Sequence, residues 1–259
     1  PSTGPIGVFD SGYGGLTILD KIRGLMPEYD YIYLGDSARC PYGPRSFEVV
    51  YEFTLQAVSK LFELGCPLVI LACNTASAKA LRTIQQINLP VIDATRRVLG
   101  VIRPTAECIG EITRSRHVGI LATAGTIKSE SYLLEIHKLS PDIVVTGEAC
   151  PMWVSLVENN EYQSEGADYF VKQHINRLLD PVIDTIILGC THYPLLLDKI
   201  RQFTPGHIRI IAQGEYVARS LQDYLNRHPE MDARCEKGGK CRFLTTESEN
   251  KFEESASIF

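Results

Sequence analysis

Two cysteines of this chain stand at corresponding places in its pattern of apolar and polar residues. Cys73 directly follows the apolar run Leu68–Ala72, and Cys190 follows the run Thr185–Leu188 after one glycine. Short runs that are apolar throughout are typical of parallel strands covered on both faces, and α/β proteins bind ligands at the carboxyl ends of such strands. A thiol at the turn into a helix faces free N–H groups and the positive end of the helix dipole. We therefore expect a lowered pKa at these thiols, which would make them candidates for proton transfer.

Two thiols that face each other across a cleft suit a reaction in which a proton leaves one face of a carbon and returns to the other. One cysteine then begins as thiolate and the other as thiol, and the roles exchange in the reverse direction. A zinc site is not predicted, because neither Cys73 nor Cys190 has a C-x-x-C neighbour. Disulfide exchange would need a nearby resolving thiol, which the local sequence lacks. Cysteine-dependent acyl transfer by Cys190 with His192 remains open on these residues alone.

Asp10 begins a glycine-rich segment directly after the first apolar run. The segment Asp10–Gly15 is similar to a phosphate-binding loop, but Thr17 stands where the G-x-G-x-x-G pattern requires its last glycine. The carboxylate of Asp10 would also repel a pyrophosphate, so a dinucleotide site is not indicated. The carboxylate could instead hold an ammonium group or orient a catalytic proton, and a simple turn residue is an equally good interpretation of this motif alone.

The order of apolar runs and helical segments predicts an α/β fold. Val- and Ile-rich runs alternate with longer segments in which apolar residues recur at helical spacing, as in βαβ units of a parallel sheet. Helices are expected over Phe47–Phe62, Ala76–Ile87 and Ala167–Leu178, and the apolar face of the first and third packs on a core. The runs expected to form strands are Ile6–Phe9, Tyr31–Leu34, Leu68–Ala72, Val118–Ala122, Ile143–Thr146, Thr185–Leu188 and Ile208–Ile211.

An internal repeat predicts two similar domains. Ile6–Gly12 resembles Val118–Ala124, and Val69–Thr75 resembles Ile186–His192, in the same order and at nearly the same spacing. A paired match in register argues for a duplicated unit rather than for a coincidence between apolar strands. We therefore predict two domains, each a mostly parallel sheet flanked by helices. A pseudo-twofold axis relates them, and the active site lies in the cleft between them.

The repeat also suggests where the domains begin and end. The first domain is predicted to comprise residues 1–98 together with 212–259, and the second to comprise residues 99–211. The polar, turn-rich stretch before Cys241 is followed by an expected strand at Cys241–Thr245 and a short amphipathic helix at Phe252–Phe259. This last part of the chain is expected to pack back on the first domain.

Composition and charge exclude several classes of protein. Of the 259 residues, 44% are hydrophobic and 22% are charged, which is typical of a globular protein and excludes a disordered or collagen-like chain. The net charge is −5 and no Lys/Arg-rich run occurs, so we expect neither nucleic acid nor a membrane surface as partner. No apolar run approaches the roughly 18 residues of a membrane span, and the first residues lack the positive region of a signal peptide. A cytoplasmic protein with reduced thiols is expected.

With these motifs in view, the chain resembles the glutamate racemase family over nearly its whole length. The wider Asp/Glu racemase superfamily shares the two-cysteine arrangement, whereas Cys73-Asn74-Thr75 together with Cys190-Thr191-His192 is most similar to the glutamate branch. The stretches that carry the resemblance are Gly7–Gly12, Gly35–Arg39, Pro41–Gly43, Ala72–Ser77 and Leu188–Pro194.

The resemblance implies an enzyme that interconverts L- and D-glutamate without a cofactor or metal and supplies D-glutamate for peptidoglycan synthesis. By motif match, Cys73 handles the α-proton on the D-glutamate side and Cys190 handles it on the L-glutamate side. Asp10, His192 and Glu158 are implied to assist these thiols. The residues implied to hold the charged groups of the substrate are Asp10, Ser11, Tyr42, Gly43, Asn74, Thr75, Thr191 and His192, with Thr123 and Thr126 as further contacts.

One region departs from the family pattern. Asp93–Leu99 adds several residues at the link between the predicted domains, and Arg103 precedes Pro104 where other residues are usual. Because the family commonly dimerises, a homodimer is expected. Activation by a cell-wall precursor is not expected. Two alternatives remain open. One is a racemase of aspartate or another amino acid, and the other is a non-catalytic amino-acid-binding protein with the same fold.

Overall fold

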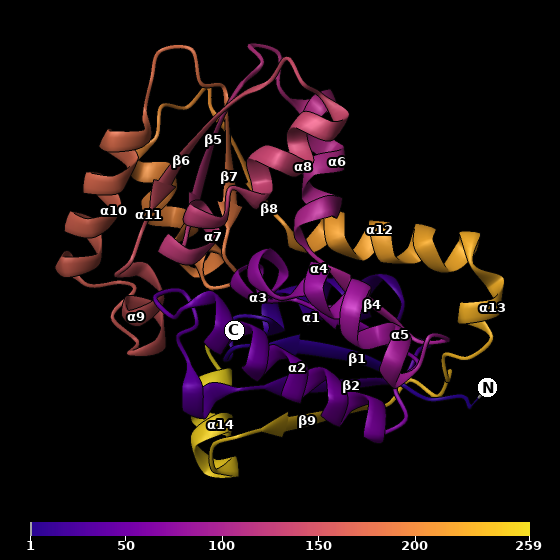
Figure 1. Cartoon of the computed structure of the whole chain (residues 1–259). Helices are drawn as coiled ribbons and strands as arrows, with labels where there is room; N and C mark the ends of the chain where they lie inside the picture. The colour runs from indigo at the N-terminus through magenta and orange to yellow at the C-terminus, as the bar shows by residue number, and fades with distance from the viewer. Residues whose placement is uncertain (1) are drawn as a thin grey trace.

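The computed structural model describes residues 2–259 and contains two parallel β-sheets, one above the other in Figure 1. In the first sheet the strands follow the order β4 (Arg97–Gly100), β3 (Leu68–Leu71), β1 (Ile6–Asp10), β2 (Tyr31–Gly35) and β9 (Cys241–Thr245). In the second sheet the order is β6 (Val144–Ala149), β5 (His117–Ala122), β7 (Thr185–Gly189) and β8 (Arg209–Ala212). The predicted α/β class with parallel sheets is therefore confirmed.

Helices cover both faces of each sheet, because residues alternate between the faces along each strand. Ile6 and Val8 of β1 belong to one core of the first sheet, and Phe9 belongs to the core on the opposite face. The covering helices of the first sheet are α1 (Leu16–Leu25) and α12 (Gly214–Arg227) on one face, with α2 (Phe47–Glu63) and α3 (Asn74–Lys79) on the other.

The second sheet is covered in the same way. Its two cores contain apolar residues of α9 (Trp153–Glu158), α10 (Glu165–Leu178) and α11 (Leu197–Phe203) on one face, and of α6 (Ile102–Ile112) and α8 (Ser131–Leu139) on the other. The remaining helices are α4 (Leu81–Thr83), α5 (Leu89–Ile92), α7 (Ala124–Ser129), α13 (Pro229–Asp232) and α14 (Glu249–Ala256), with short turns η1 (Ser37–Arg39), η2 (Ile84–Asn88) and η3 (Tyr193–Leu196).

The two sheets share one strand order, which confirms the internal repeat. The order β4-β3-β1-β2 in the first sheet corresponds to β8-β7-β5-β6 in the second, and β9 is the additional strand. Gly7 pairs with Val69 in the first sheet, and Gly119 pairs with Ile186 in the second. These are the residues that the sequence repeat places at equivalent positions. The turns after β3 and β7, which carry the two cysteines, are therefore structurally equivalent.

Near the first link the structure contains a strand that was not predicted and breaks a predicted helix. The segment Asp93–Leu99 is not only a link, because Arg97–Gly100 forms β4 and pairs with β3, and the predicted boundary at residue 99 falls inside this strand. Only Val98 of the strand is fully buried, so β4 lacks the apolar run by which the other strands are predicted. The helix expected over Ala76–Ile87 is interrupted at Ala80 and passes through a π-helical turn, η2, before α5.

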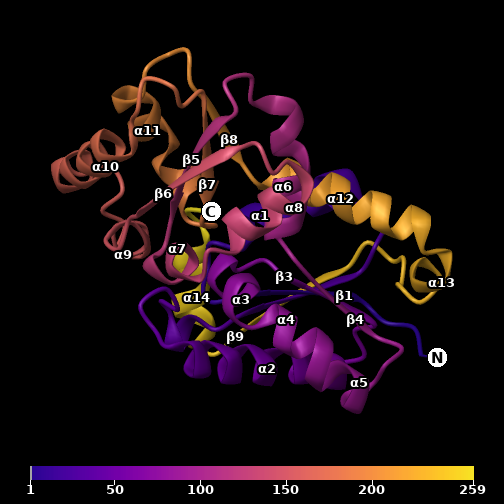
Figure 2. The same cartoon turned by 45° about the horizontal axis from the view of Figure 1, so that its top comes forward.

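The last part of the chain adds to the first sheet. The strand predicted at Cys241–Thr245 is present as β9 and pairs with β2, and α14 begins three residues earlier than the predicted helix. The rings of Phe252 and Phe259 lie 5.5 and 6.3 Å from that of Tyr13, after β1. In Figures 1 and 2 the C-terminal end lies between the two sheets. Within residues 2–259, no helix is long and apolar enough to cross a membrane.

Candidate active site

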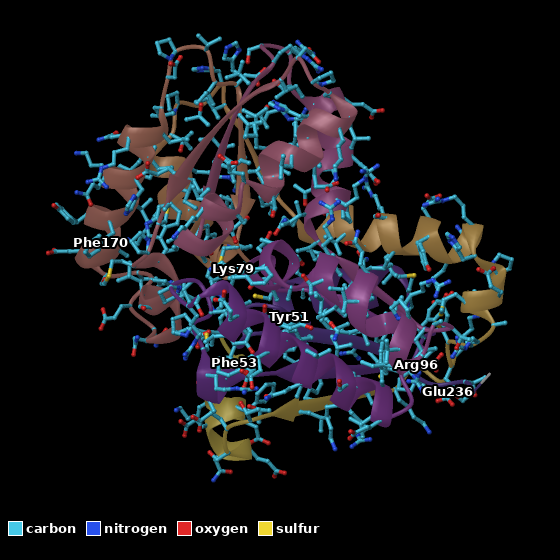
Figure 3. The ribbon with its side chains drawn as sticks, viewed as in Figure 1. Tyr51, Phe53, Lys79, Arg96, Phe170 and Glu236 are labelled. Carbon is cyan, nitrogen blue, oxygen red and sulfur yellow. The ribbon has the colours of Figure 1, made fainter. Side chains whose placement is uncertain are left out.

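The turns that follow β1, β3, β5 and β7 meet around one small cavity. Lys79, at the end of α3, lies at the boundary between the upper and lower halves in Figure 3. The cavity is lined by Ser11, Pro41, Tyr42, Gly43, Cys73, Asn74, Thr75, Thr123, Val154, Cys190, Thr191 and His192.

Cys73 occupies the N-cap position of α3, where its Sγ accepts a hydrogen bond from Ala76 N at 3.4 Å. The thiol donates to Ser11 Oγ at 3.6 Å. Behind it lies Asp10, which is fully buried and whose Oδ2 accepts from Gly12 N at 3.1 Å. Burial raises the pKa of the Asp10 carboxyl, while the charge of His192 opposes that rise. The Cys73 half of the site is thus a thiol between a hydroxyl, a backbone N–H and a buried carboxyl group.

The expected lowering of the Cys73 pKa is wrong. Burial, with a further contribution from the charge of Asp10, raises the pKa of this thiol to about 12, and the hydrogen bond from Ala76 N only partly offsets the rise. Desolvation penalises the charged form, and here it outweighs the helix N-terminus. Cys73 is therefore held as a thiol, and once ionised it is a strong base.

Cys190 has a different set of neighbours. Its Sγ lies 3.9 Å from His192 Nδ1, and His192 Nε2 makes a short hydrogen bond with Glu158 Oε1 on α9. Burial lowers the pKa of His192, but its bonds with Cys190 and Glu158 raise the pKa by more, to about 10. His192 is therefore a cation near neutral pH. This cation lies directly beside the sulfur of Cys190.

Thr191 connects the two halves of the site. Its Oγ1 lies 3.5 Å from Asp10 Oδ1 and 3.4 Å from His192 Nδ1. The connection requires the backbone after β1 to come very close, because a Cβ on Gly14 would lie 2.4 Å from Thr191 Oγ1 and 2.5 Å from His192 Nδ1. Only glycine fits at this position without displacing both side chains.

Direct contacts also join the two halves on the other side of the cavity. Gly125 N donates to Gly43 O at 3.0 Å, and the Oγ1 atoms of Thr75 and Thr123 lie 2.9 Å apart. Tyr42 also lines the cavity, and its hydroxyl donates to the buried carboxylate of Asp36, which holds the side chain in place. Polar groups from both sheets therefore surround a single space.

The structure brings most of the predicted site residues to this space. Seven of the eight residues predicted to hold the substrate line the cavity, and Asp10 lies behind them. Glu158 is also behind the lining, in contact with His192, and Thr126 accepts a hydrogen bond from Thr123 at 3.1 Å. Pro41 and Val154, the latter on α9, also line the cavity and were not predicted as site residues, because an apolar side chain carries no polar signal that could identify it.

Comparison with known proteins identifies the family of this chain. The model of the family described as Asp/Glu/Hydantoin racemase matches residues 17–221. The chain belongs to this family. Glutamate racemase from Shouchella clausii is 38% identical over 254 residues, which cover 98% of this chain and 89% of that protein.

Solved structures of racemases have the same fold. Glutamate racemase isoform RacE1 from Bacillus anthracis has a TM-score of 0.89 and 36% identity, and the match covers 98% of this chain and 92% of that one. Glutamate racemase from Francisella tularensis, solved in complex with D-glutamate, has a TM-score of 0.86 and 31% identity, with 99% and 93% of the chains covered. The resemblance to glutamate racemases and the two-domain racemase fold are therefore confirmed.

One group in this racemase could ligate a metal ion. Cys40, Glu158 and His192 each place one potential ligand atom within 4.8 Å of the others, and no further group of this kind occurs among residues 2–259. His192 Nε2 is already hydrogen-bonded to Glu158, so a metal would have to displace the proton that this bond holds. Three ligands also fall short of the four of a structural zinc site. The arrangement fits proton transfer better than metal binding.

Proposed function

We propose that this protein interconverts L- and D-glutamate by proton transfer between Cys73 and Cys190. The observation that carries the proposal is that these two thiols line one cavity from equivalent turns of two repeated sheets. The relatives of the chain support glutamate as the substrate, since they are glutamate racemases at 36–38% identity over nearly the whole chain.

In the L-to-D direction, the thiolate of Cys190 removes the α-proton, so that an S–H bond forms as the Cα–H bond breaks. The electron pair of that bond passes into the α-carboxylate. The thiol of Cys73 then gives its proton to the opposite face of Cα and becomes a thiolate. The motif match supports the assignment of Cys190 to L-glutamate and Cys73 to D-glutamate, and the reverse reaction exchanges their roles.

The charges around the two thiols support this starting state. The cation at His192 lies beside Cys190, the proposed base, and the pKa of about 12 keeps Cys73, the proposed acid, protonated. The α-proton of an amino acid is weakly acidic, and the resemblance implies no cofactor to take up the charge. Hydrogen-bond donors from Asn74, Thr75 and Thr191, all of them buried, must then stabilise the charge that develops on the α-carboxylate.

We further propose the setting in which this activity operates. The family resemblance supports a cytoplasmic enzyme that supplies D-glutamate for peptidoglycan synthesis and acts as a homodimer. The proposed domains are residues 1–98 with 212–259, and residues 99–211, which separate the Asp10 and Cys73 turns from the Cys190 turn. Light scattering at several protein concentrations tests the dimer, and a mass of one chain at all of them would rule it out.

The test of the function is proton NMR of the purified protein with L-glutamate in D2O and no added cofactor. We expect the α-proton signal to disappear while D-glutamate accumulates, as measured by a chiral assay. If a folded protein leaves the α-proton in place and produces no D-glutamate, the proposal is wrong. Parallel incubations with L-aspartate and other amino acids then identify a different racemase, and calorimetric binding of glutamate without exchange identifies a binding protein.

A further inference from the structure

A closed network of buried polar side chains surrounds Gln213, the residue between β8 and α12. Gln213 Oε1 accepts from Asn74 Nδ2 at 2.7 Å, and Gln213 Nε2 lies 3.1 Å from Asn74 Oδ1, so the two amides pair in both directions. Tyr132 and Thr105 complete the network with contacts to Gln213 Nε2 at 2.5 and 3.0 Å. All four residues are buried, with exposures of 3% or less. Among them, only Asn74 lines the cavity.

Thr105 determines which way the network is oriented. Its hydroxyl donates to Val101 O at 2.9 Å, so its oxygen is left as an acceptor for Gln213. The atom of Gln213 that faces Thr105 must then be the nitrogen, and the atom that faces Asn74 Nδ2 must be the oxygen. An inverted Gln213 amide would place its oxygen against Thr105 and its nitrogen against the nitrogen of Asn74.

The orientation of Asn74 follows from that of Gln213. Asn74 Oδ1 accepts from the Tyr132 hydroxyl at 2.5 Å as well as facing Gln213 Nε2, so its acceptor sites are occupied. Asn74 Nδ2 uses one of its two hydrogens on Gln213 Oε1, and residues 2–259 offer the other hydrogen no acceptor. The second N–H of Asn74 is therefore left for a ligand in the cavity, next to Cys73.

We propose that Gln213 is a positioning residue that makes Asn74 a hydrogen-bond donor toward a carboxylate of the substrate. This inference rests on the proposed glutamate racemisation, since a carboxylate is the group that an unpaired, buried N–H recognises. Without Gln213, the Asn74 amide can rotate and turn its carbonyl oxygen toward the carboxylate, which repels it. Gln213 thus acts on the substrate through Asn74, although it does not line the cavity.

The network also spans the two halves of the molecule. Asn74 begins α3, which covers the first sheet, whereas Thr105 and Tyr132 lie on α6 and α8, which cover the second. Gln213 lies where the chain leaves β8 for α12, the helix that packs on α1 of the first sheet. The donor of Asn74 is therefore set only when the two halves are together.

The experiment is a cycle of the variants Gln213→Leu, Asn74→Ala and the double variant. We expect Gln213→Leu to lower kcat/KM for glutamate about 10-fold or more, the loss typical of one charge-assisted hydrogen bond. In the Asn74→Ala background the same change should cost less than about 2-fold, because the group it positions is gone. Calorimetric binding of racemic glutamate gives the same comparison if Asn74→Ala turns over too slowly to measure.

Gln85→Leu is the control for the substitution itself, because the amide of Gln85, an exposed residue, also donates a hydrogen bond, to Val98 O at 2.8 Å, but does not line the cavity. It should leave kcat/KM within 2-fold of the parent. Equal losses from Gln213→Leu in both backgrounds, or no loss in the parent, would overturn the positioning role. An inactive parent protein would instead contradict the proposed racemisation, so the two failures are distinguishable. Thermal unfolding identifies any variant that does not fold. If Gln213→Leu does not fold, Thr105→Val replaces it, and we expect the same coupling to Asn74.

Discussion

The Cys73 and Cys190 halves of the site have the same backbone but different neighbours. Each cysteine follows a central strand of its sheet, at a turn that the register shows to be equivalent. Around Cys73 lie a hydroxyl, a backbone N–H and the buried Asp10, whereas Cys190 lies beside His192, which Glu158 contacts from the other side.

The difference shows how a duplicated fold can serve a reaction that needs two unlike partners. A fully symmetric pair of thiols would share one protonation state, but proton transfer through a carbon needs one base and one acid. Beside Cys73 a buried carboxyl group opposes ionisation of the thiol, whereas Cys190 lies beside a cation. The repeat thus places the two sulfur atoms, and the divergence around them decides which one holds the proton.

The largest effect is expected from removing either sulfur. Cys73→Ala and Cys190→Ala should each reduce racemisation at least about 1,000-fold, within the range for loss of a general acid or base. Racemisation of both enantiomers is measured by a chiral assay. The control is Cys108→Ala, a half-buried thiol on α6 that does not line the cavity. Near-normal turnover by either cysteine variant would contradict the two-base mechanism.

Removing the carboxylate on the Cys73 side should have the next largest effect. Asp10→Asn should lower kcat about 100-fold and change KM much less, because Asp10 acts on a thiol rather than lining the cavity. Steady-state kinetics in both directions provides the measurement. A change confined to KM would show instead that Asp10 holds the ammonium group of the substrate.

A smaller effect is expected from the carboxylate on the Cys190 side. Glu158→Gln should lower kcat about 10-fold and shift the alkaline limb of its pH profile to lower pH, because Glu158 helps to raise the pKa of His192. The exposed Glu161, three residues further along the chain, supplies the control variant Glu161→Gln. An unchanged pH profile in Glu158→Gln would contradict this role of Glu158. The two halves of the site would then differ less than proposed.

The smallest predicted effect concerns stability. The pKa of His192 is raised from 6.5 to about 10, so its contribution to the free energy of unfolding is complete below pH 6.5 and is lost as the pH rises through about 10. The stability difference between the parent and His192→Asn should shrink over this range by at least about 1.4 kcal/mol, the equivalent of one pKa unit. Urea unfolding at pH 6 and pH 10 measures it, with exposed His207→Asn as control. A difference that stays constant with pH would contradict a charged His192.

Sequence patterns could predict the fold and the position of the site because both depend on local order. Apolar runs identify buried strands, and the polar residues that directly follow them must lie at one edge of a sheet. The edge strand β4 escapes this rule, since Arg97 is exposed and only Val98 is fully buried. Gln213 also follows a predicted strand, but its partners Asn74 and Tyr132 are 139 and 81 residues away. Only the folded chain brings them together.

The raised pKa of Cys73 could not be predicted from the sequence, for a similar reason. A helix N-terminus can be recognised from the turn that precedes it, whereas desolvation depends on everything that packs around the thiol. The buried Asp10, 63 positions earlier in the chain, is one such neighbour. The sequence therefore predicts which groups meet in the site, and the three-dimensional packing decides their charges.

The contacts between Gly43 and Gly125 and between Thr75 and Thr123 have a kinetic consequence. They hold the two halves together over a cavity whose lining is almost entirely buried, so we expect glutamate to enter and leave only when these contacts open. Each is a neutral hydrogen bond worth about 0.5–1.5 kcal/mol, which thermal motion breaks readily. Every turnover must then include an opening and a closing, on the microsecond to millisecond timescale of such motions. The speed of this enzyme would then be set as much by the viscosity of its surroundings as by the chemistry of its thiols.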